Sequence, residues 1–136
     1  MIRRRSGLLS LLRQRAAARA ARARPDPEDD PAARYHVYVI RLDRAVAQHR
    51  RFLDANPRWD PRKPCVYVGM SACPPEERLR QHLEGYKASR YAHRYGRELI
   101  PRLYERFNPM TYRAAQRMEV ELARRLRRRG YGVWQH

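Results

Sequence analysis

Residues 64–82, PCVYVGMSACPPEERLRQH, join a predicted strand to a predicted helix. The first part, CVYVG, is rich in β-branched and aromatic residues and predicts a strand that stops at Gly69. Two prolines and two glutamates follow, which is the composition that the first turn of a helix favours. We therefore predict a sharp turn from strand to helix, with a helix that reaches about Glu84 and ends at Gly85.

Further elements lie on both sides of this stretch. Residues 35–42, YHVYVIRL, alternate and predict another strand. An insertion follows at 43–63, with a short helical pattern that ends in prolines. Residues 86–97 predict a short helix, and ELIPRLYERF at 98–107 predicts a third strand, whose Pro101 suits an edge position.

The strongest helical pattern covers residues 112–129, with Thr111 as a plausible N-cap and Gly130 as its stop. The expected fold class is therefore α/β (α+β), with a small three-stranded antiparallel sheet flanked by helices in a domain at 34–136. The long helix carries one apolar stripe, formed by Ala115, Met118, Leu122 and Leu126.

The composition indicates a polyanionic partner. The chain has 136 residues, enough for one small domain, and its 31 Lys and Arg against 14 Asp and Glu give a net charge of +17. Nucleic acid, with DNA first, is the partner that such a charge favours. No apolar run has the roughly 18 to 20 residues of a membrane helix. Cys65 and Cys73 match neither a zinc-binding nor a disulfide pattern, so we expect reduced thiols in a cytoplasmic, nucleoid-associated protein.

Residues 1–33 differ from the rest. They carry eight arginines before the first acid, Asp26, and then an acidic stretch with prolines. Three interpretations stay open: a disordered or helical basic arm that adds phosphate affinity, a transit peptide, and an extension from a misplaced start codon. The sequence leaves the oligomeric state open.

The order of these elements and motifs resembles the GIY-YIG nuclease family over residues 35–134. HVY at 36–38 places Tyr38 in the first motif, and YVG at 67–69 forms the second. The downstream arginine and the helix glutamate of the family match Arg78 and Glu119. Three features depart from the family pattern: His36 stands in place of a glycine, the strand connection is long, and Gln135 is the nearest match to a polar residue after the long helix.

The resemblance implies a compact α/β domain that hydrolyses phosphodiester bonds with one divalent ion, Mg²⁺ or Mn²⁺. By this resemblance Tyr38 and Tyr67 position or deprotonate the attacking water, Arg78 neutralises phosphate charge, and Glu119 binds the metal. His82, one turn after Arg78, is a further catalytic candidate. Stabilisation of a more anionic transition state by arginine and metal is where most of such catalysis arises.

Helical spacing separates Arg78 from its neighbour Arg80. Arg80 has Glu76 and Glu84 four residues away, so ordinary surface ion pairs explain it. Arg78 has no acid at these spacings, which leaves its charge for an external anion.

The same reasoning separates two acids. Glu119 lies about 55° from the centre of the apolar stripe and borders the core, whereas Glu121 lies about 105° away. Glu121 can pair with Arg117 or Arg125, which favours Glu119 as the metal ligand.

The two motif tyrosines and the segment at 86–97 each have a purely structural interpretation beside the functional one. Tyr38 and Tyr67 alternate with valines, which fits a paired-tyrosine face but is also usual for core tyrosines, while Gly69 would turn the strand and admit phosphate. The segment at 86–97 interleaves aromatics and cations, which favours nucleic-acid binding or else a core with a solvated basic face. Its candidate binding residues are Lys87, Arg90, Tyr91, Arg94 and Arg97.

The expected function is a metal-dependent DNA endonuclease, acting for example at repair intermediates or branched structures. The alternative is a nucleic-acid-binding module that keeps the fold without cleavage. Association with RNA or ribosomes is a third interpretation, and it rests on arginine content alone.

Overall fold

The computed structural model describes residues 11, 13, 14 and 31–135. By its contacts the chain divides into two units, Met1–Asp30 and Pro31–His136, and all elements below belong to the second. The arm predicted for residues 1–33 lies almost wholly outside the described residues.

The second unit alternates strands and short helices before one long helix. Its elements, in chain order, are β1 (His36–Leu42), the 3-10 helix η2 (Arg44–Gln48), α2 (Arg50–Asp54), β2 (Cys65–Ser71), α3 (Pro75–Glu84), α4 (Arg90–Tyr95), β3 (Gly96–Leu99), the 3-10 helices η3 (Pro101–Leu103) and η4 (Glu105–Phe107), α5 (Tyr112–Arg128) and β4 (Gly132–Trp134).

The sheet has four strands in the order β3-β1-β2-β4. β1 pairs antiparallel with β2 and β3, whereas β4 pairs parallel with β2. The α+β class with flanking helices is therefore confirmed, but the prediction of three antiparallel strands is wrong. β4 has only three residues and begins at Gly132, shortly after Gly130, so the sequence shows no alternating pattern that predicts a strand there.

The third predicted strand, 98–107, is also largely wrong. Strand β3 ends at Leu99, and the rest of the stretch forms η3 and η4. Pro101 begins η3, where its missing N–H costs no hydrogen bond. β3 does lie at a sheet edge, as the proline suggested.

Two helices follow the sequence closely. α3 ends at Glu84, and Gly85 caps it with a φ of 85°, a left-handed conformation that favours glycine. Helix α5 begins after Thr111, whose hydroxyl accepts the N–H of Ala114 at 3.2 Å. Among the described helices, none has the length and apolar character needed to cross a membrane.

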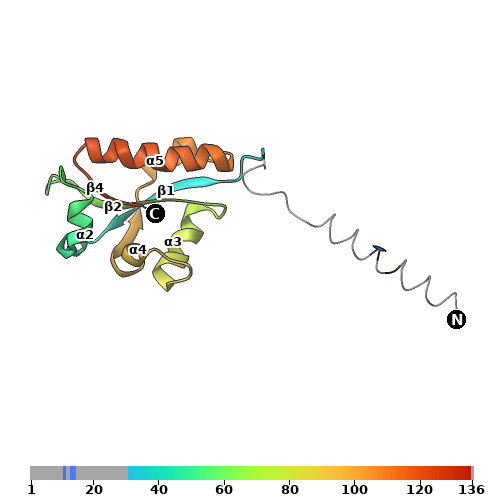
Figure 1. The fold of residues 1–136 in the computed structure, drawn as a ribbon, viewed down its shortest axis with the longest axis horizontal. Coiled ribbons are helices and arrows are strands. Elements are labelled where there is room, and N and C mark those ends of the chain that lie inside the picture. Colours follow the sequence, from blue (N-terminus) through green and yellow to red (C-terminus); the bar gives the residue numbers. More distant parts are fainter. Residues whose placement is uncertain (1–10, 12, 15–30, 136) are drawn as a thin grey trace. The chain divides into compact units, whose positions relative to one another are not determined.

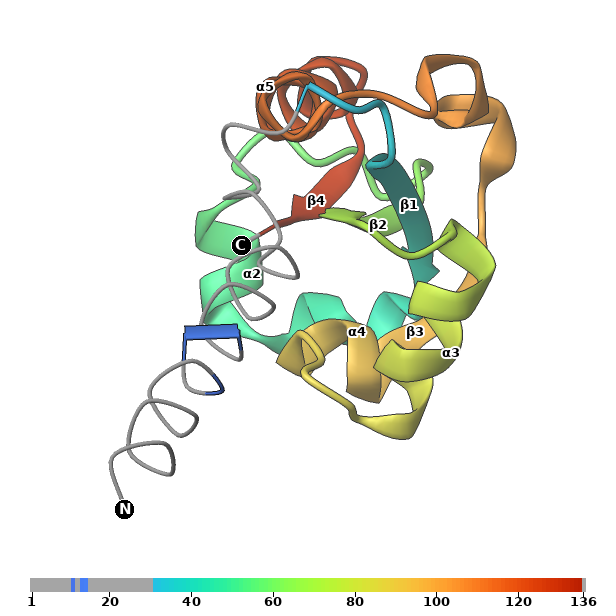
Figure 2. The ribbon, with the colours of Figure 1, turned by 90° about the vertical axis from the view of Figure 1, so that its right-hand side faces the viewer.

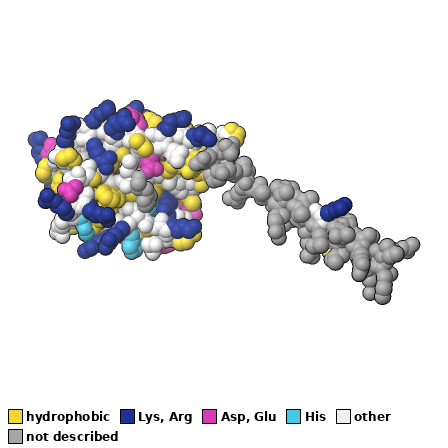
Figure 3. Space-filling model, in the orientation of Figure 1, with side chains coloured by type: hydrophobic (Ala, Val, Ile, Leu, Met, Phe, Trp, Pro, Cys, Tyr) yellow, Lys and Arg dark blue, Asp and Glu magenta, His cyan; other side chains and the backbone are white. Residues whose placement is uncertain are grey.

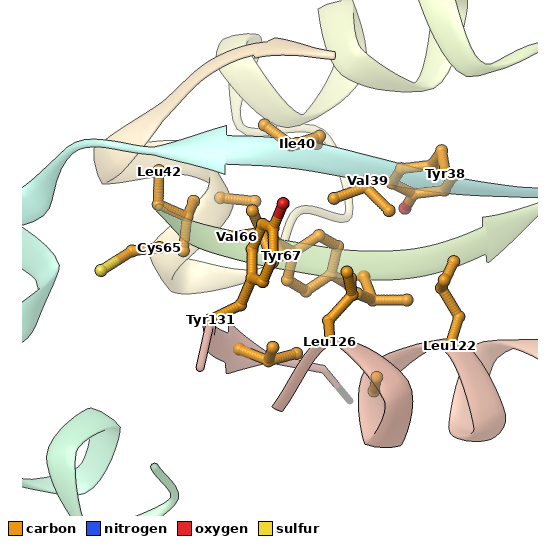
Figure 4. Close-up of a cluster of buried hydrophobic side chains, with 14 of the residues drawn as sticks. Tyr38, Val39, Ile40, Leu42, Cys65, Val66, Tyr67, Leu122, Leu126 and Tyr131 are labelled. Atoms are coloured by element: carbon orange, nitrogen blue, oxygen red, sulfur yellow. The ribbon is translucent and has the colours of Figure 1, made fainter. Parts of the chain in front are cut away.

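The sheet lies between α5 on one side and α3 and α4 on the other (Figures 1 and 2). Figure 4 shows the core that this arrangement buries, where side chains of β1 and β2 meet Leu122 and Leu126 of α5. Side chains that alternate along a strand therefore pack on different helices, because one face of the sheet contacts α5 and the other contacts α3 and α4. The face on which a tyrosine lies thus decides which helix it contacts.

Candidate active site

Tyr38 and Tyr67 lie on the same face of the sheet and are buried, with exposed fractions of 1% and 0%. In the β1–β2 register Tyr38 is opposite Gly69, and Tyr67 is opposite Ile40. The two phenol rings are 6.2 Å apart between centroids. The strands thus bring the two motif tyrosines together, as a paired-tyrosine face requires.

Gly69 serves packing rather than a turn. Strand β2 continues past it to Ser71, so the prediction that Gly69 ends the strand is wrong. A Cβ at this position would meet the Tyr38 hydroxyl and would lie 2.6 Å from Cζ of the same ring. Glycine is needed because the Tyr38 side chain lies across its partner position on β2.

His82 of α3 is fully buried and joins the helix to these tyrosines. Its Nε2 is 2.8 Å from the Tyr38 hydroxyl, and its ring centroid is 5.2 Å from that of Tyr67. The backbone N–H of Ser89 donates to Nδ1 at 3.2 Å. In the neutral imidazole the proton is therefore on Nε2, which donates to the Tyr38 oxygen.

The Arg78 guanidinium, one turn before His82, is held by neutral acceptors. Its Nη1 donates to Gln81 Oε1 at 2.9 Å and to the Tyr86 carbonyl at 3.2 Å, and its Nη2 donates to the Lys87 carbonyl at 2.7 Å. No carboxylate pairs with it within residues 31–135. Its orientation is fixed while its charge stays uncompensated.

Lys87 contributes to the neutral cradle of Arg78, which is formed by Gln81 Oε1 and the carbonyls of Tyr86 and Lys87. Its φ of 43° is the only positive value among the described non-glycine residues, and its carbonyl accepts from Arg78. Such a conformation costs free energy in an ordinary residue. The loop between α3 and α4 is thereby bent around the guanidinium.

Arg80 differs from the prediction. It is exposed, and the structure contains no ion pair between it and Glu76 or Glu84. The helical spacing allowed these pairs, but such exposed pairs contribute little and the side chains extend into solvent.

The two acids of α5 lie in different environments. Glu121 forms ion pairs with Arg125 at 3.1 Å and Arg124 at 3.5 Å, which confirms the pairing predicted with Arg125. Glu119 is half-buried and has no ion pair or hydrogen bond in the described part of the chain. Burial raises the pKa of Glu119 to about 7.

The four central residues influence each other electrostatically. Burial raises the pKa of Tyr38 to about 12, against the opposing charge of Arg78, and the Glu119 carboxylate adds to the rise. Burial also raises the pKa of Tyr67, with Tyr38 and Glu119 contributing. Both phenols therefore keep their protons at neutral pH.

The donor chemistry at Glu119 fits a hard divalent cation. Among the residues described, no three His, Cys, Asp or Glu side chains gather as a metal cluster. Mg²⁺ keeps several waters and needs one or two protein carboxylates, so one is enough. A half-buried carboxylate whose pKa is raised by burial, and which lacks a basic partner in the described chain, gains from a bound cation.

The predicted nucleic-acid-binding segment divides in two. Tyr91 is buried and packs against Trp134 with ring centroids 4.8 Å apart, so its predicted role in stacking on a base is corrected to a core role. Arg97 is compensated by Asp43 at 2.9 Å. Lys87, Arg90 and Arg94 are exposed.

Two of the noted departures can be placed. His36 occupies β1, and its Nδ1 is buried without a hydrogen-bond partner in the described structure. Gln135 follows β4 and lines a cavity beside α5, and none of Tyr38, Tyr67, Arg78 and Glu119 lines that cavity.

Sequence reasoning missed the groups that hold the site in place. Gln81 was visible at three residues from Arg78, a spacing at which helix side chains meet. The other groups are backbone atoms of the loop between α3 and α4, namely the Tyr86 and Lys87 carbonyls and the Ser89 N–H. Their positions depend on the path of this loop, which no pattern of residues predicts.

Comparisons with protein-family models, with curated proteins and with solved structures find no match to this chain.

Proposed function

We propose that this protein is a divalent-metal-dependent endonuclease of the GIY-YIG type that hydrolyses DNA phosphodiester bonds. The observation that carries the proposal is Glu119, a half-buried carboxylate with no basic partner in the described chain, whose charge acts on both motif tyrosines. In a domain with this excess of arginine, an uncompensated acid at such a place supports a role in holding a cation.

Each residue has a task that its environment supports. Arg78 is pre-oriented by three neutral acceptors and would meet the charge of the scissile phosphate. Tyr38, with a pKa of about 12, acts as a phenol that positions water, because a base works best with a pKa near the working pH. Mg²⁺ or Mn²⁺ at Glu119 would supply positive charge beside the phosphate.

The surface supports a nucleic-acid substrate. Lys and Arg side chains predominate over acidic ones on the face of the described unit in Figure 3. Arginine binds phosphate through a planar fork, which favours close contacts with a nucleic-acid backbone. Within this proposal the substrates are DNA molecules with unpaired or branched parts, such as repair intermediates.

A second candidate is a nucleic-acid-binding module without catalysis. The burial of both tyrosine side chains favours it, because a catalytic hydroxyl must reach water or substrate. This module would bind DNA or RNA with an affinity that falls as salt rises, and it would yield no product.

A nicking assay tests the proposal. Duplex, flap and single-stranded DNA are incubated with the full chain in Mg²⁺, in Mn²⁺ and in EDTA, beside the variants Glu119→Gln and Glu121→Gln. We expect cleavage only with metal, its loss in Glu119→Gln and its retention in Glu121→Gln. Binding without product under every metal would support the second candidate instead.

A further inference from the structure

A cavity of about 420 Å³ lies between α5, the loop after α2 and the residues around β4. Its volume is within the range of roughly 300 to 1,000 Å³ that is usual for small-molecule sites. Among the described residues no carboxylate lines it. The lining residues on which the argument depends are Trp59, Arg124, Arg127, Arg128, Tyr131 and Gln135.

Arg127 is built into the cavity wall. Its Nε donates to Asn56 Oδ1 at 3.2 Å, and its Nη2 donates to the Val133 carbonyl at 3.0 Å. Asn56 is itself fixed, since its Nδ2 donates to the Phe52 and Val133 carbonyls. Burial lowers the pKa of Arg127, and both of its hydrogen-bond partners are neutral, so no carboxylate of the described residues compensates its positive charge.

The other lining groups add flat apolar surface and a hydrogen-bond acceptor. Trp59 and Tyr131 present aromatic rings to the cavity, and a cation already lies near each ring. The Oε1 of Gln135 is buried and accepts no hydrogen bond from the described residues. A buried acceptor of this kind is open to a donor, and an N–H group of a bound ligand would supply one.

A fixed cation, aromatic rings and a buried acceptor together match a nucleotide, which has a phosphate, a flat base and N–H donors. We propose that this cavity holds one unpaired nucleotide of the nucleic-acid substrate. The inference rests on the proposed function. It adds a preference for substrates in which one base is free to leave the stack.

The position of the cavity supports this assignment. Val120, which lines it, directly follows Glu119 on α5. A nucleic-acid strand bound along α5 would pass both the cavity and the proposed metal ligand. A base within a duplex must first unstack and unpair, which an unpaired nucleotide avoids.

The test measures binding in EDTA, where no cleavage occurs. Dissociation constants are determined for a duplex with one unpaired adenosine, for the same duplex with an abasic residue there, and for the fully paired duplex. We expect the wild-type chain to bind the unpaired adenosine roughly tenfold more tightly than the abasic residue, as base stacking typically provides.

Two sets of substitutions separate binding of a base in the cavity from the general positive charge of α5. Trp59→Leu, combined with Arg124→Gln and Arg128→Gln, removes an aromatic ring on which the base would stack together with two exposed cavity cations, and we expect the tenfold ratio to fall toward one. Arg125→Gln with Arg129→Gln removes two charges from the same helix end and, like the first set, one ion pair to Glu121. This control should weaken binding to all three duplexes and keep the ratio.

A wild-type ratio near one, or an equal loss of the ratio in both sets of substitutions, overturns the proposal. Adenosine monophosphate that binds more tightly than the bulged duplex would assign the cavity to free nucleotides and overturn the strand-bound version. If wild type nicks DNA but binds the two duplexes with a ratio near one, only the nucleotide-binding role of the cavity is refuted. If the tenfold ratio is found without nicking, only the proposed catalysis is refuted.

Discussion

The Nε2 of His82 lies 2.8 Å from the hydroxyl of Tyr38, and both side chains are buried between α3 and the sheet. This bond fixes the rotation of α3 against β1. Because Arg78 precedes His82 by one helical turn, the same bond decides where the guanidinium lies relative to the tyrosines. The contact is therefore structural and functional at once.

Loss of the His82 ring should destabilise the domain. His82→Ala would leave the Tyr38 hydroxyl and the Ser89 N–H without their partner in a buried place, which should lower the free energy of unfolding by about 2–4 kcal/mol. Urea unfolding measures this change. Arg80→Ala is the control because Arg80 lies exposed on the same helix, and it should cost about 0.5 kcal/mol. Equal losses in the two variants would contradict a special role for His82.

Gly69→Ala should be destabilising because the new methyl group would meet the Tyr38 ring. Overpacking of this kind typically costs about 1–3 kcal/mol. Thermal or urea unfolding measures the loss. Tyr38→Phe removes the atom nearest to the new methyl group, so the double variant should lose less stability than the sum of the single variants. If the losses of unfolding free energy in the two single variants simply add up in the double variant, the new methyl group at position 69 does not clash with the Tyr38 side chain.

Stability should depend on pH through Glu119. Its pKa rises from 4.5 to about 7 on folding without metal, so the folded state holds the proton more tightly. The stabilisation is complete below the lower value and is lost as pH rises through the upper one. In EDTA, wild-type stability relative to Glu119→Gln should therefore fall between pH 4.5 and 7.

Glu121→Gln is the matched control for this pH profile. Glu121 is paired with two arginines, and removal of its charge should leave the fall between these pH values in place. A wild-type profile parallel to that of Glu119→Gln would show that Glu119 does not titrate in this range.

Mg²⁺ should stabilise the folded protein above pH 7 through the same carboxylate. A ligand that binds only the folded state, at a hundredfold excess over its Kd, adds about 2.7 kcal/mol. The melting temperature of wild type should therefore rise with Mg²⁺ concentration, while that of Glu119→Gln should stay unchanged. An equal rise in both proteins would place the ion elsewhere.

The sequence was most informative where local chemistry decides the structure. Gly85 and Thr111 predicted helix ends correctly, because a left-handed cap and a hydroxyl cap depend on one residue each. The alternation in β1 and β2 correctly placed Tyr38 and Tyr67 on faces opposite to their neighbouring valines. The absence of acids around Arg78 in the helix also agrees with the neutral cradle that holds it.

The failures concern relationships between distant segments. β4 forms because Gly132 and Val133 pair with Cys65 and Val66 of β2, 67 residues earlier in the chain, and three residues carry too weak a pattern to predict it. Gly69 looked like a strand end because its reason, the Tyr38 ring, comes from another strand. The cavity beside α5 joins loop, helix and chain end, so no single stretch of sequence indicates it.

The single-turnover nicking rate on a flap DNA in Mg²⁺, measured for wild type, Arg78→Ala and Arg80→Ala, shows whether Arg78 takes part in cleavage. Arg78 is held without an acid partner beside the tyrosines, whereas Arg80 of the same helix extends into solvent. We predict that Arg78→Ala slows nicking by about 100-fold or more, as loss of one transition-state contact does, and that Arg80→Ala stays within about threefold of wild type. No cleavage by wild type, or equal rates for the two variants, would contradict the account.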